Sequence, residues 1–262
     1  MSTISSFHDP SVIVDRLRAA GCVFAEDEAR LLMSAARTPD DLAAMVDRRA
    51  AGLPLEHVLG WAEFCGLRIA VDPGVFVPRR RTEFLVQQAL AVLQGRPQAV
   101  VVDLCCGSGA VGAALTDALE QVEVHAVDVD PAAVRCARRN LAADHVYEGD
   151  LYEPLPTALR GRVGVLVANA PYVPTDAVDL LPAEARLYEA RVALDGGADG
   201  LDIVRRVTAA ATRWLAPGGH LLVESSERQA PRVVQAIVSA GLTPSVARSE
   251  ELAATVVIGT RP

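Results

Sequence analysis

The stretch A-V-V-V-D-L-C-C-G-S-G-A-V-G, residues 99–112, decides the fold class of this chain. Its apolar start is typical of a buried strand, and the small residues after Gly109 are typical of a helix. Gly107, Gly109 and Gly112 form G-x-G-x-x-G, in which glycines let the backbone turn tightly and approach a ligand closely. The stretch therefore predicts a strand–loop–helix unit with a ligand at the loop. The loop residues expected to approach that ligand are Cys105, Cys106, Gly107, Ser108 and Gly109.

The chain after residue 80 repeats this alternation of strand and helix. Further apolar strands are predicted at 122–128, 163–169 and 220–225, with a short one over 145–147 and helices between them. Near-continuous apolar strands that alternate with helices indicate an α/β fold with a parallel sheet covered on both faces. Two closing strands, 242–248 and 254–260, are joined by a short polar turn and predict an antiparallel edge.

The first part of the chain has a different pattern, which is helical. Asp9-Pro10 and Thr38-Pro39 read as starts of helices, because each supplies an N-cap side chain and a proline at the first helical position. A β-hairpin is predicted next, from the spacing of apolar residues between Trp61 and Val71. We therefore expect three parts: a helical domain at 1–58, a linking hairpin at 59–78 and the sheet domain at 79–262.

Three carboxylates are expected at the carboxyl ends of the strands, where parallel sheets bind ligands. Asp128 follows the Gly-rich loop by about twenty residues, the position from which an acidic side chain holds a ribose diol. Asp103 would repel a phosphate but suits a cationic amino group. This pair favours a nucleoside that carries an amino-acid group, namely S-adenosylmethionine, over a dinucleotide. Asp150 and Leu151 are placed to meet the amino group and the ring of adenine.

The motif Asn169-Ala170-Pro171-Tyr172 follows the strand at 163–169 and faces the same edge. A methyl sulfonium needs a nucleophile held in line at about 3 Å. The Asn169 carboxamide oxygen can accept one N–H of a planar amide or aromatic amine, and the Ala170 carbonyl can accept the other. Pro171 restricts the turn and Tyr172 can pack on the planar group. We expect Asn169 to contact both cofactor and substrate, with Asn169, Pro171 and Tyr172 as catalytic residues.

Composition and charge narrow the class of protein. The net charge of −8 argues against broad nucleic-acid binding, which needs a positive surface. No apolar run approaches the ~20 residues of a membrane span, and residues 1–10 lack the blocks of a signal peptide, so a cytoplasmic protein is expected. A monomer is also expected. The five cysteines are expected to be reduced and mostly buried, and the five histidines show no ligand spacing, so no metal is assigned.

Four segments resemble motifs of the glutamine-N5 protein methyltransferases that act on peptide chain release factors. D-L-C-C-G-S-G-A-V-G is similar to D-L-G-T-G-S-G-A-I-A, and V-F-V-P-R-R-R-T-E-F-L-V to I-P-R-P-E-T-E-x-L-V. Y-E-A-R-V-A-L-D-G-G-A-D-G-L resembles Y-E-P-x-x-A-L-x-G-G-x-D-G-L, and L-P-L-E-H-V-L-G-W-A-E-F-C-G-L resembles P-x-x-Y-I-x-G-x-x-x-F-x-G. The resemblance implies a seven-stranded class I, Rossmann-like, S-adenosylmethionine-dependent methyltransferase domain with a helical substrate-docking domain. It also implies methylation of the glutamine in the release factor's Gly-Gly-Gln loop.

The chain departs from these motifs at several positions. Ala170 replaces the first proline of Asn-Pro-Pro-Tyr but keeps the carbonyl that the chemistry needs. Cys105 replaces a glycine, for which we expect a negative φ. Of Arg79–Arg81 we expect one to form a structural ion pair, and Glu224 is expected to be a structural carboxylate rather than a base.

Three other functions stay open at this stage. The chain could methylate a different protein glutamine, such as one in a ribosomal protein. It could instead methylate adenine N6 in nucleic acid, or bind the cofactor without catalysis.

Overall fold

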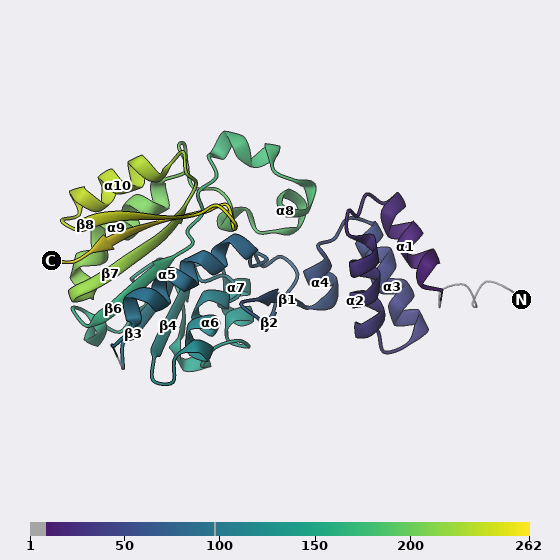
Figure 1. Ribbon diagram of the computed structural model, residues 1–262, viewed down its shortest axis with the longest axis horizontal. Coiled ribbons are helices and arrows are strands. Elements are labelled where there is room, and N and C mark those ends of the chain that lie inside the picture. Colours follow the sequence, from purple (N-terminus) through teal and green to yellow (C-terminus); the bar gives the residue numbers. More distant parts are fainter. Residues whose placement is uncertain (1–8, 97) are drawn as a thin grey trace, which may run out of the picture.

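The computed structural model describes residues 9–96 and 98–262 (Figure 1). The segment 1–8, which we assigned to the helical domain and examined for a targeting signal, lies outside the described residues. The main sheet contains β3 (Val100–Leu104), β4 (Glu123–Asp128), β5 (Val146–Glu148), β6 (Val163–Ala168), β7 (Leu215–Ser225), β8 (Thr243–Ser249) and β9 (Ala254–Thr260).

The seven strands lie in the order β5-β4-β3-β6-β7-β9-β8. Strands β3 to β7 pair in parallel, and β9 is antiparallel to both of its neighbours, β7 and β8. The predicted parallel sheet with an antiparallel end is therefore confirmed. The antiparallel strand lies one place inside the edge, because β9 inserts between β7 and β8.

Helices cover both faces of the sheet because its strands are apolar on both sides. One face carries α5 (Glu83–Leu93), α6 (Ala110–Ala118) and α7 (Pro131–Ala137), and the other carries α9 (Asp202–Trp214) and α10 (Ala230–Ser239). Neighbouring residues of one strand enter opposite cores: Val101 packs toward α5 and α6, whereas Val102 packs toward α9 and α10. This is the period of two that a pleated strand requires.

The helical unit lies beside the sheet domain and has a core of its own (Figure 1). Its elements and the hairpin after them are α1 (Pro10–Ala19), α2 (Ala25–Ala35), α3 (Pro39–Ala50), α4 (Leu55–Leu59), β1 (Trp61–Phe64) and β2 (Leu67–Ala70). The caps expected from the sequence are present. Asp9 accepts a hydrogen bond from Ser11 N at 3.0 Å, and Thr38 accepts one from Asp41 N at 3.1 Å.

A segment between Asn-Ala-Pro-Tyr and α9, for which the sequence predicted no element, connects the two units. It contains α8 (Ala183–Tyr188) between the 3₁₀ helices η5 (Thr175–Leu180) and η6 (Arg191–Ala193). Arg49 of α3 bonds Glu184 of α8 at 2.6 Å, and the Tyr188 hydroxyl donates to the Ala51 carbonyl at 3.3 Å. The helical unit is thus fixed to a segment that adjoins the carboxyl ends of the strands.

Two expectations about the whole chain concern its helices and its thiols. No helix within residues 9–96 and 98–262 combines the length and apolarity that a bilayer span requires.

The cysteines are free, as expected, and Cys22, Cys106 and Cys136 are buried. Burial raises the pKa of the Cys105 and Cys106 thiols, so both are neutral and unreactive at ordinary pH.

Candidate active site

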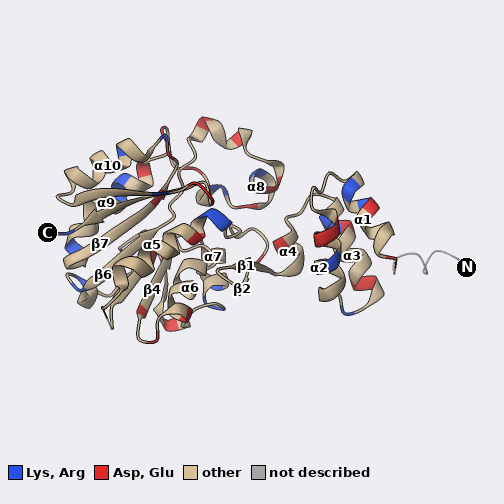
Figure 2. Cartoon of the chain, viewed as in Figure 1, with Lys and Arg blue, Asp and Glu red and all other residues tan. Residues whose placement is uncertain are grey.

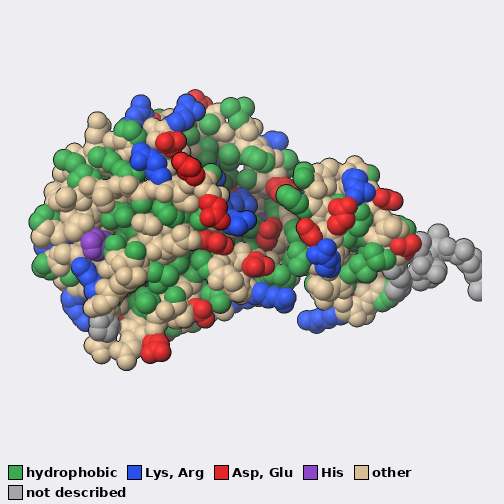
Figure 3. All heavy atoms as spheres, in the orientation of Figure 1, with side chains coloured by type: hydrophobic (Ala, Val, Ile, Leu, Met, Phe, Trp, Pro, Cys, Tyr) green, Lys and Arg blue, Asp and Glu red, His purple; other side chains and the backbone are tan. Residues whose placement is uncertain are grey.

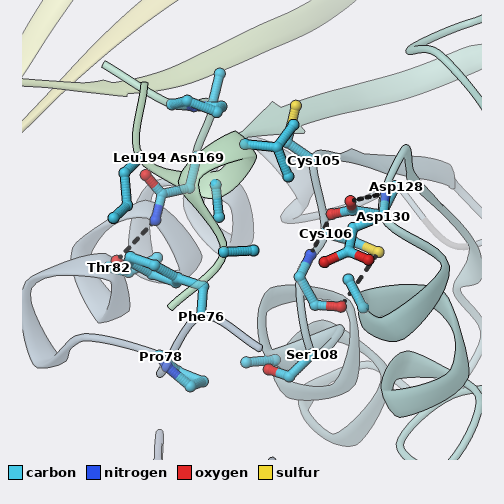
Figure 4. Close-up of a pocket in the computed structure, with 18 of the residues that line it drawn as sticks. Phe76, Pro78, Thr82, Cys105, Cys106, Ser108, Asp128, Asp130, Asn169 and Leu194 are labelled. Atoms are coloured by element: carbon cyan, nitrogen blue, oxygen red, sulfur yellow. Dashed lines mark hydrogen bonds between the residues drawn. The ribbon is translucent and has the colours of Figure 1, made fainter. Parts of the chain in front are cut away.

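A cavity of roughly 470 Å³ opens where the strand order reverses, between the carboxyl ends of β3 and β6. This switch point is the place where open parallel sheets bind ligands. The cavity brings together almost all residues predicted from the sequence, although they come from four separate loops (Figure 4). Those that line it are Asp103, Cys105, Cys106, Gly107, Ser108, Asp128, Asp150, Leu151, Asn169, Ala170, Pro171 and Tyr172.

Gly109 is the exception, because it is not among the residues that line the cavity. It precedes α6 with φ +77°, and its amide donates to the Cys106 carbonyl at 2.8 Å. A Cβ at this position would lie 2.8 Å from Leu141 Cδ1. Gly109 is therefore required by a left-handed backbone and by close packing, and its contact with a ligand stays a prediction.

Cys105 contradicts the expectation of a negative φ. Its φ is +57°, in the left-handed region that side chains disfavour. The loop keeps this conformation because its next amide, that of Cys106, donates to the Val127 carbonyl of β4 at 3.0 Å. This hydrogen bond thus holds Cys105 in a backbone conformation that suits glycine better.

A pair of variants measures the strain at Cys105. At an ordinary φ, alanine stabilises a protein over glycine by about 0.4–1 kcal/mol. Here we expect the reverse, with Cys105→Gly more stable than Cys105→Ala by about 1 kcal/mol, because only glycine relieves the left-handed strain. Both variants lose the thiol, so the comparison isolates the backbone. Urea unfolding of the two proteins measures the difference, and an alanine variant at least as stable as the glycine variant would contradict it.

Two buried carboxylates hold the Gly-rich loop in place. Asp128 accepts hydrogen bonds from Gly107 N at 2.8 Å and from Asp130 N at 2.9 Å (Figure 4). Burial raises the pKa of Asp128, and these amide donors oppose the rise. Asp103 accepts from Gly112 N at 3.1 Å, and burial raises its pKa to about 7. A cationic group beside Asp103 would favour its ionised form.

Asp150 and Leu151 also line the cavity. The Asp150 carboxylate pairs with Arg206 of α9 at 2.5 Å, and Leu151 is buried with φ +50°. An ion pair with an exposed arginine leaves carboxylate lone pairs free for a further donor. The contact of Asp150 with adenine stays a prediction.

The motif Asn169-Ala170-Pro171-Tyr172 begins where β6 ends, at Ala168. The Asn169 side chain donates from Nδ2 to Thr82 Oγ1 at 3.3 Å (Figure 4). Ala170 is buried, and Tyr172 is half-buried beneath the Arg81 guanidinium, 5.7 Å from the ring centroid. The carboxamide and the aromatic ring therefore border one cavity with the Gly-rich loop.

Two glycines for which no role was predicted, Gly196 and Gly200, support this motif from behind. A Cβ at Gly196 would lie 2.6 Å from the Pro171 carbonyl oxygen, and one at Gly200 would lie 2.2 Å from that of Tyr172. Gln229 Nε2 also donates to the Tyr172 carbonyl at 2.9 Å. The glycines of G-G-A-D-G thus allow the backbone of this segment to pack directly against the backbone of Pro171 and Tyr172. Its glycines were visible in the sequence, but the partner they approach was not.

The triple arginine forms two structural ion pairs, which corrects the expectation of one. Arg79 pairs with the buried Glu189 at 2.5 Å, and Arg81 pairs with the buried Glu224 at 3.3 Å. Arg80 is exposed. Glu224 has the structural position expected of it, at the end of β7.

A group of side chains at the amino end of β4, away from the cavity, has ligand-type atoms close together. Glu123, His125 and His145 place such atoms within 4.8 Å of one another, a proximity that their spacing in the sequence did not reveal. His125 contacts Glu123 at 2.8 Å through Nε2 and the Tyr147 hydroxyl at 3.1 Å through Nδ1, and it stacks on His145. These contacts satisfy both nitrogens of the buried ring.

Comparison with known proteins agrees with this geometry. The family described as methyltransferase small domain matches residues 66–200. A methyltransferase of 16S rRNA from T. thermophilus, solved with AdoMet and guanosine, superposes with a TM-score of 0.54 at 20% identity, covering 77% of this chain and 50% of that one. The fold and the cavity at its switch point therefore define a class I methyltransferase.

The sequence relatives define the family more narrowly. The release factor glutamine methyltransferase of Geobacter sulfurreducens is 42% identical over 75% of this chain and 70% of its own length. That of Mycolicibacterium smegmatis is 39% identical over 82% of this chain and 78% of its own. The chain belongs to the release factor glutamine methyltransferase family, as its motifs indicated.

Proposed function

We propose that this protein transfers a methyl group from S-adenosylmethionine to the side-chain nitrogen of a glutamine, in the Gly-Gly-Gln loop of a peptide chain release factor. The observation that carries the proposal is the shared cavity, in which the Asn169 carboxamide borders the same space as the Gly-rich loop and Asp128. Family membership supports the choice of substrate. A cytoplasmic location is part of the same proposal.

The residues of the cavity fit S-adenosylmethionine. Asp103, Asp128 and Asp150 line it, so the site is acidic and suits a ligand with an ammonium group, a sulfonium and a ribose diol. The buried Ser108 hydroxyl oxygen has no hydrogen-bond partner among the described residues, which leaves it for a ligand. Asp128 would hold the ribose and Asp103 would face the amino group. When bound, the cofactor supplies an electrophilic methyl group, and S-adenosylhomocysteine is the product.

The task left to the chain is to hold a poor nucleophile in line. Asn169 Oδ1 and the Ala170 carbonyl each accept one N–H of the glutamine amide, which fixes the nitrogen and favours its pyramidal form. The ring of Tyr172 packs on the planar amide. The nitrogen gains the methyl group and loses one proton to solvent, so no strong base is required. Positioning of this kind can account for a large part of a methyl-transfer rate.

Labelled S-adenosylmethionine, a purified release factor and the unmodified chain test this proposal directly. We expect one methyl group on the glutamine of Gly-Gly-Gln and none on a factor with that glutamine changed to glutamate. Mass spectrometry locates the label. In parallel incubations with ribosomal protein and with DNA, labelling of either one but not of the factor would overturn the proposed substrate and support one of the other functions. The interleaved acidic and basic side chains in view favour protein over nucleic acid (Figures 2 and 3).

Removal of the Asp128 charge is expected to weaken cofactor binding. A charge-assisted hydrogen bond contributes about 1.5–3 kcal/mol, so Asp128→Asn should raise the Kd for S-adenosylmethionine by roughly ten- to a hundredfold. Asp117→Asn is the matched control, because it makes the same charge change on the exposed side of α6. Calorimetry on both variants gives the two affinities. Equal affinities of the two variants would contradict the proposed contact between Asp128 and the ribose.

The helical unit is proposed to dock the protein substrate rather than the cofactor. It contributes no residue of α1, α2 or α3 to the cavity, among the residues that the structure describes. It does contact α8, whose Glu184 and Ala185 line the cavity. A partner bound to the helical unit would therefore reach the cavity across α8.

A further inference from the structure

The Asn169 carboxamide is hydrogen-bonded at one end only. Its Nδ2 donates to Thr82 Oγ1 at 3.3 Å, and no donor in the described part of the chain bonds to its Oδ1 (Figure 4). Thr82 is 3% exposed, in the 3₁₀ helix η2 (Arg80–Thr82) before α5. The two ends of a carboxamide have the same shape but opposite hydrogen-bonding roles. The end that contacts Thr82 therefore decides which end is left for the substrate.

The Thr82 hydroxyl lies beside the buried carboxyl of Glu224. Its carboxyl is 3% exposed, and Oε1 accepts from Arg81 Nε at 3.3 Å, whereas the buried Oε2 has no partner within hydrogen-bond geometry. Burial raises the pKa of Glu224, while the Thr82 hydroxyl and the Arg81 guanidinium lower it. An ionised carboxylate only accepts hydrogen bonds, so Glu224 can accept the hydroxyl proton of Thr82 but cannot donate to it. The hydroxyl then presents a lone pair to Asn169.

We propose that Thr82 is a positioning residue, whose hydroxyl, oriented by Glu224, holds the Asn169 carboxamide with Nδ2 inward and Oδ1 toward the substrate. This inference rests on the proposed function, in which Oδ1 accepts an N–H of the glutamine. The reversed carboxamide would set an NH₂ group against that N–H, donor against donor. Arg81 links Glu224 to Tyr172, because its guanidinium contacts the Glu224 carboxylate and also lies over the tyrosine ring.

Two substitutions of Thr82 separate the hydroxyl from the shape of the side chain. Thr82→Val keeps the shape and removes the hydroxyl, whereas Thr82→Ser keeps the hydroxyl. We expect Thr82→Val to lower kcat for the release factor by about tenfold, the effect of one lost hydrogen bond, with the Kd for S-adenosylmethionine unchanged. Thr82→Ser should keep most of the rate. A valine variant as fast as the unmodified chain, or a serine variant as slow as the valine one, would overturn the inference.

A second readout does not depend on turnover. In ¹⁵N-asparagine-labelled protein, the side-chain NH₂ signal of Asn169 is identified by its loss in Asn169→Ala. Its protons should exchange with solvent faster in Thr82→Val than in the unmodified chain, and not in Thr82→Ser. Equal exchange in all three proteins overturns the proposed orientation. If the unmodified chain methylates no glutamine, the proposed function fails, but the exchange measurement still decides how the carboxamide is held.

Discussion

Asn169→Ala is expected to lower kcat by on the order of 10²–10³, the effect of removing one preorganised polar group at a reacting centre. In the proposed mechanism, the Asn169 oxygen accepts a hydrogen bond that strengthens as the substrate nitrogen becomes pyramidal. An interaction made mainly in the transition state appears in turnover more than in binding. Single-turnover rates at saturating donor measure the loss. Cofactor affinity and the free energy of unfolding should change much less.

Two further variants separate the acceptor from the rest of the motif. Asn169→Asp keeps an acceptor oxygen and should retain more activity than Asn169→Ala. Ala170→Pro restores the Asn-Pro-Pro-Tyr of the family motif and should preserve activity, because only the carbonyl of residue 170 takes part. If Asn169→Ala transfers methyl groups as fast as the unmodified chain, the reacting centre lies elsewhere.

The convergence of these residues could be predicted from the sequence because it follows from sheet topology. Asp103, Asp128 and Asn169 end three apolar runs, and the carboxyl ends of parallel strands meet at one edge. No side-chain contact is needed for that inference. Most of the fold could be predicted for the same reason, because the apolar pattern of the strands and the Gly-rich turn are both local features of the sequence.

The supports of the site could not be predicted, because they depend on contacts between residues far apart in the sequence. Thr82 meets Asn169 across 87 positions, and Arg81 meets Glu224 across 143. Thr82 belongs to a motif of the family and Glu224 ends a strand, but the contacts that each of them makes depend on the fold. The left-handed backbone of Cys105 is similar, since a hydrogen bond of the next residue to β4 fixes it.

The α8 segment was missed for a related reason. Its helix is six residues long, too short to show a clear apolar period. Its contacts with Arg49 and Ala51 tie it to the helical unit. Tertiary contact, and not local propensity, therefore accounts for this element.

Loss of Arg49 should destabilise the helical unit more than any other single change proposed for it. Arg49 and Glu28 are each about nine-tenths buried, and two hydrogen bonds of 2.6 and 3.1 Å join them. Arg49 also donates to the Leu53 carbonyl at 2.9 Å and to Glu184 at 2.6 Å. Arg49→Met leaves the Glu28 carboxylate buried without its cation, for which we expect a loss of about 3–5 kcal/mol. Hydrogen exchange of amides in α2 and α3 measures the stability of this unit.

Two comparisons show whether the uncompensated charge is the cause. Arg16→Met removes an exposed arginine that pairs with Asp47 on α3 at 2.6 Å, and such a pair contributes only about 0–1 kcal/mol. Glu28→Leu combined with Arg49→Met removes both charges, and apolar replacements of a buried pair are often neutral. The double variant should therefore recover most of the stability that Arg49→Met loses. If it is as unstable as Arg49→Met alone, the bonds that Arg49 makes stabilise the helical unit themselves, and the loss does not come from a stranded carboxylate.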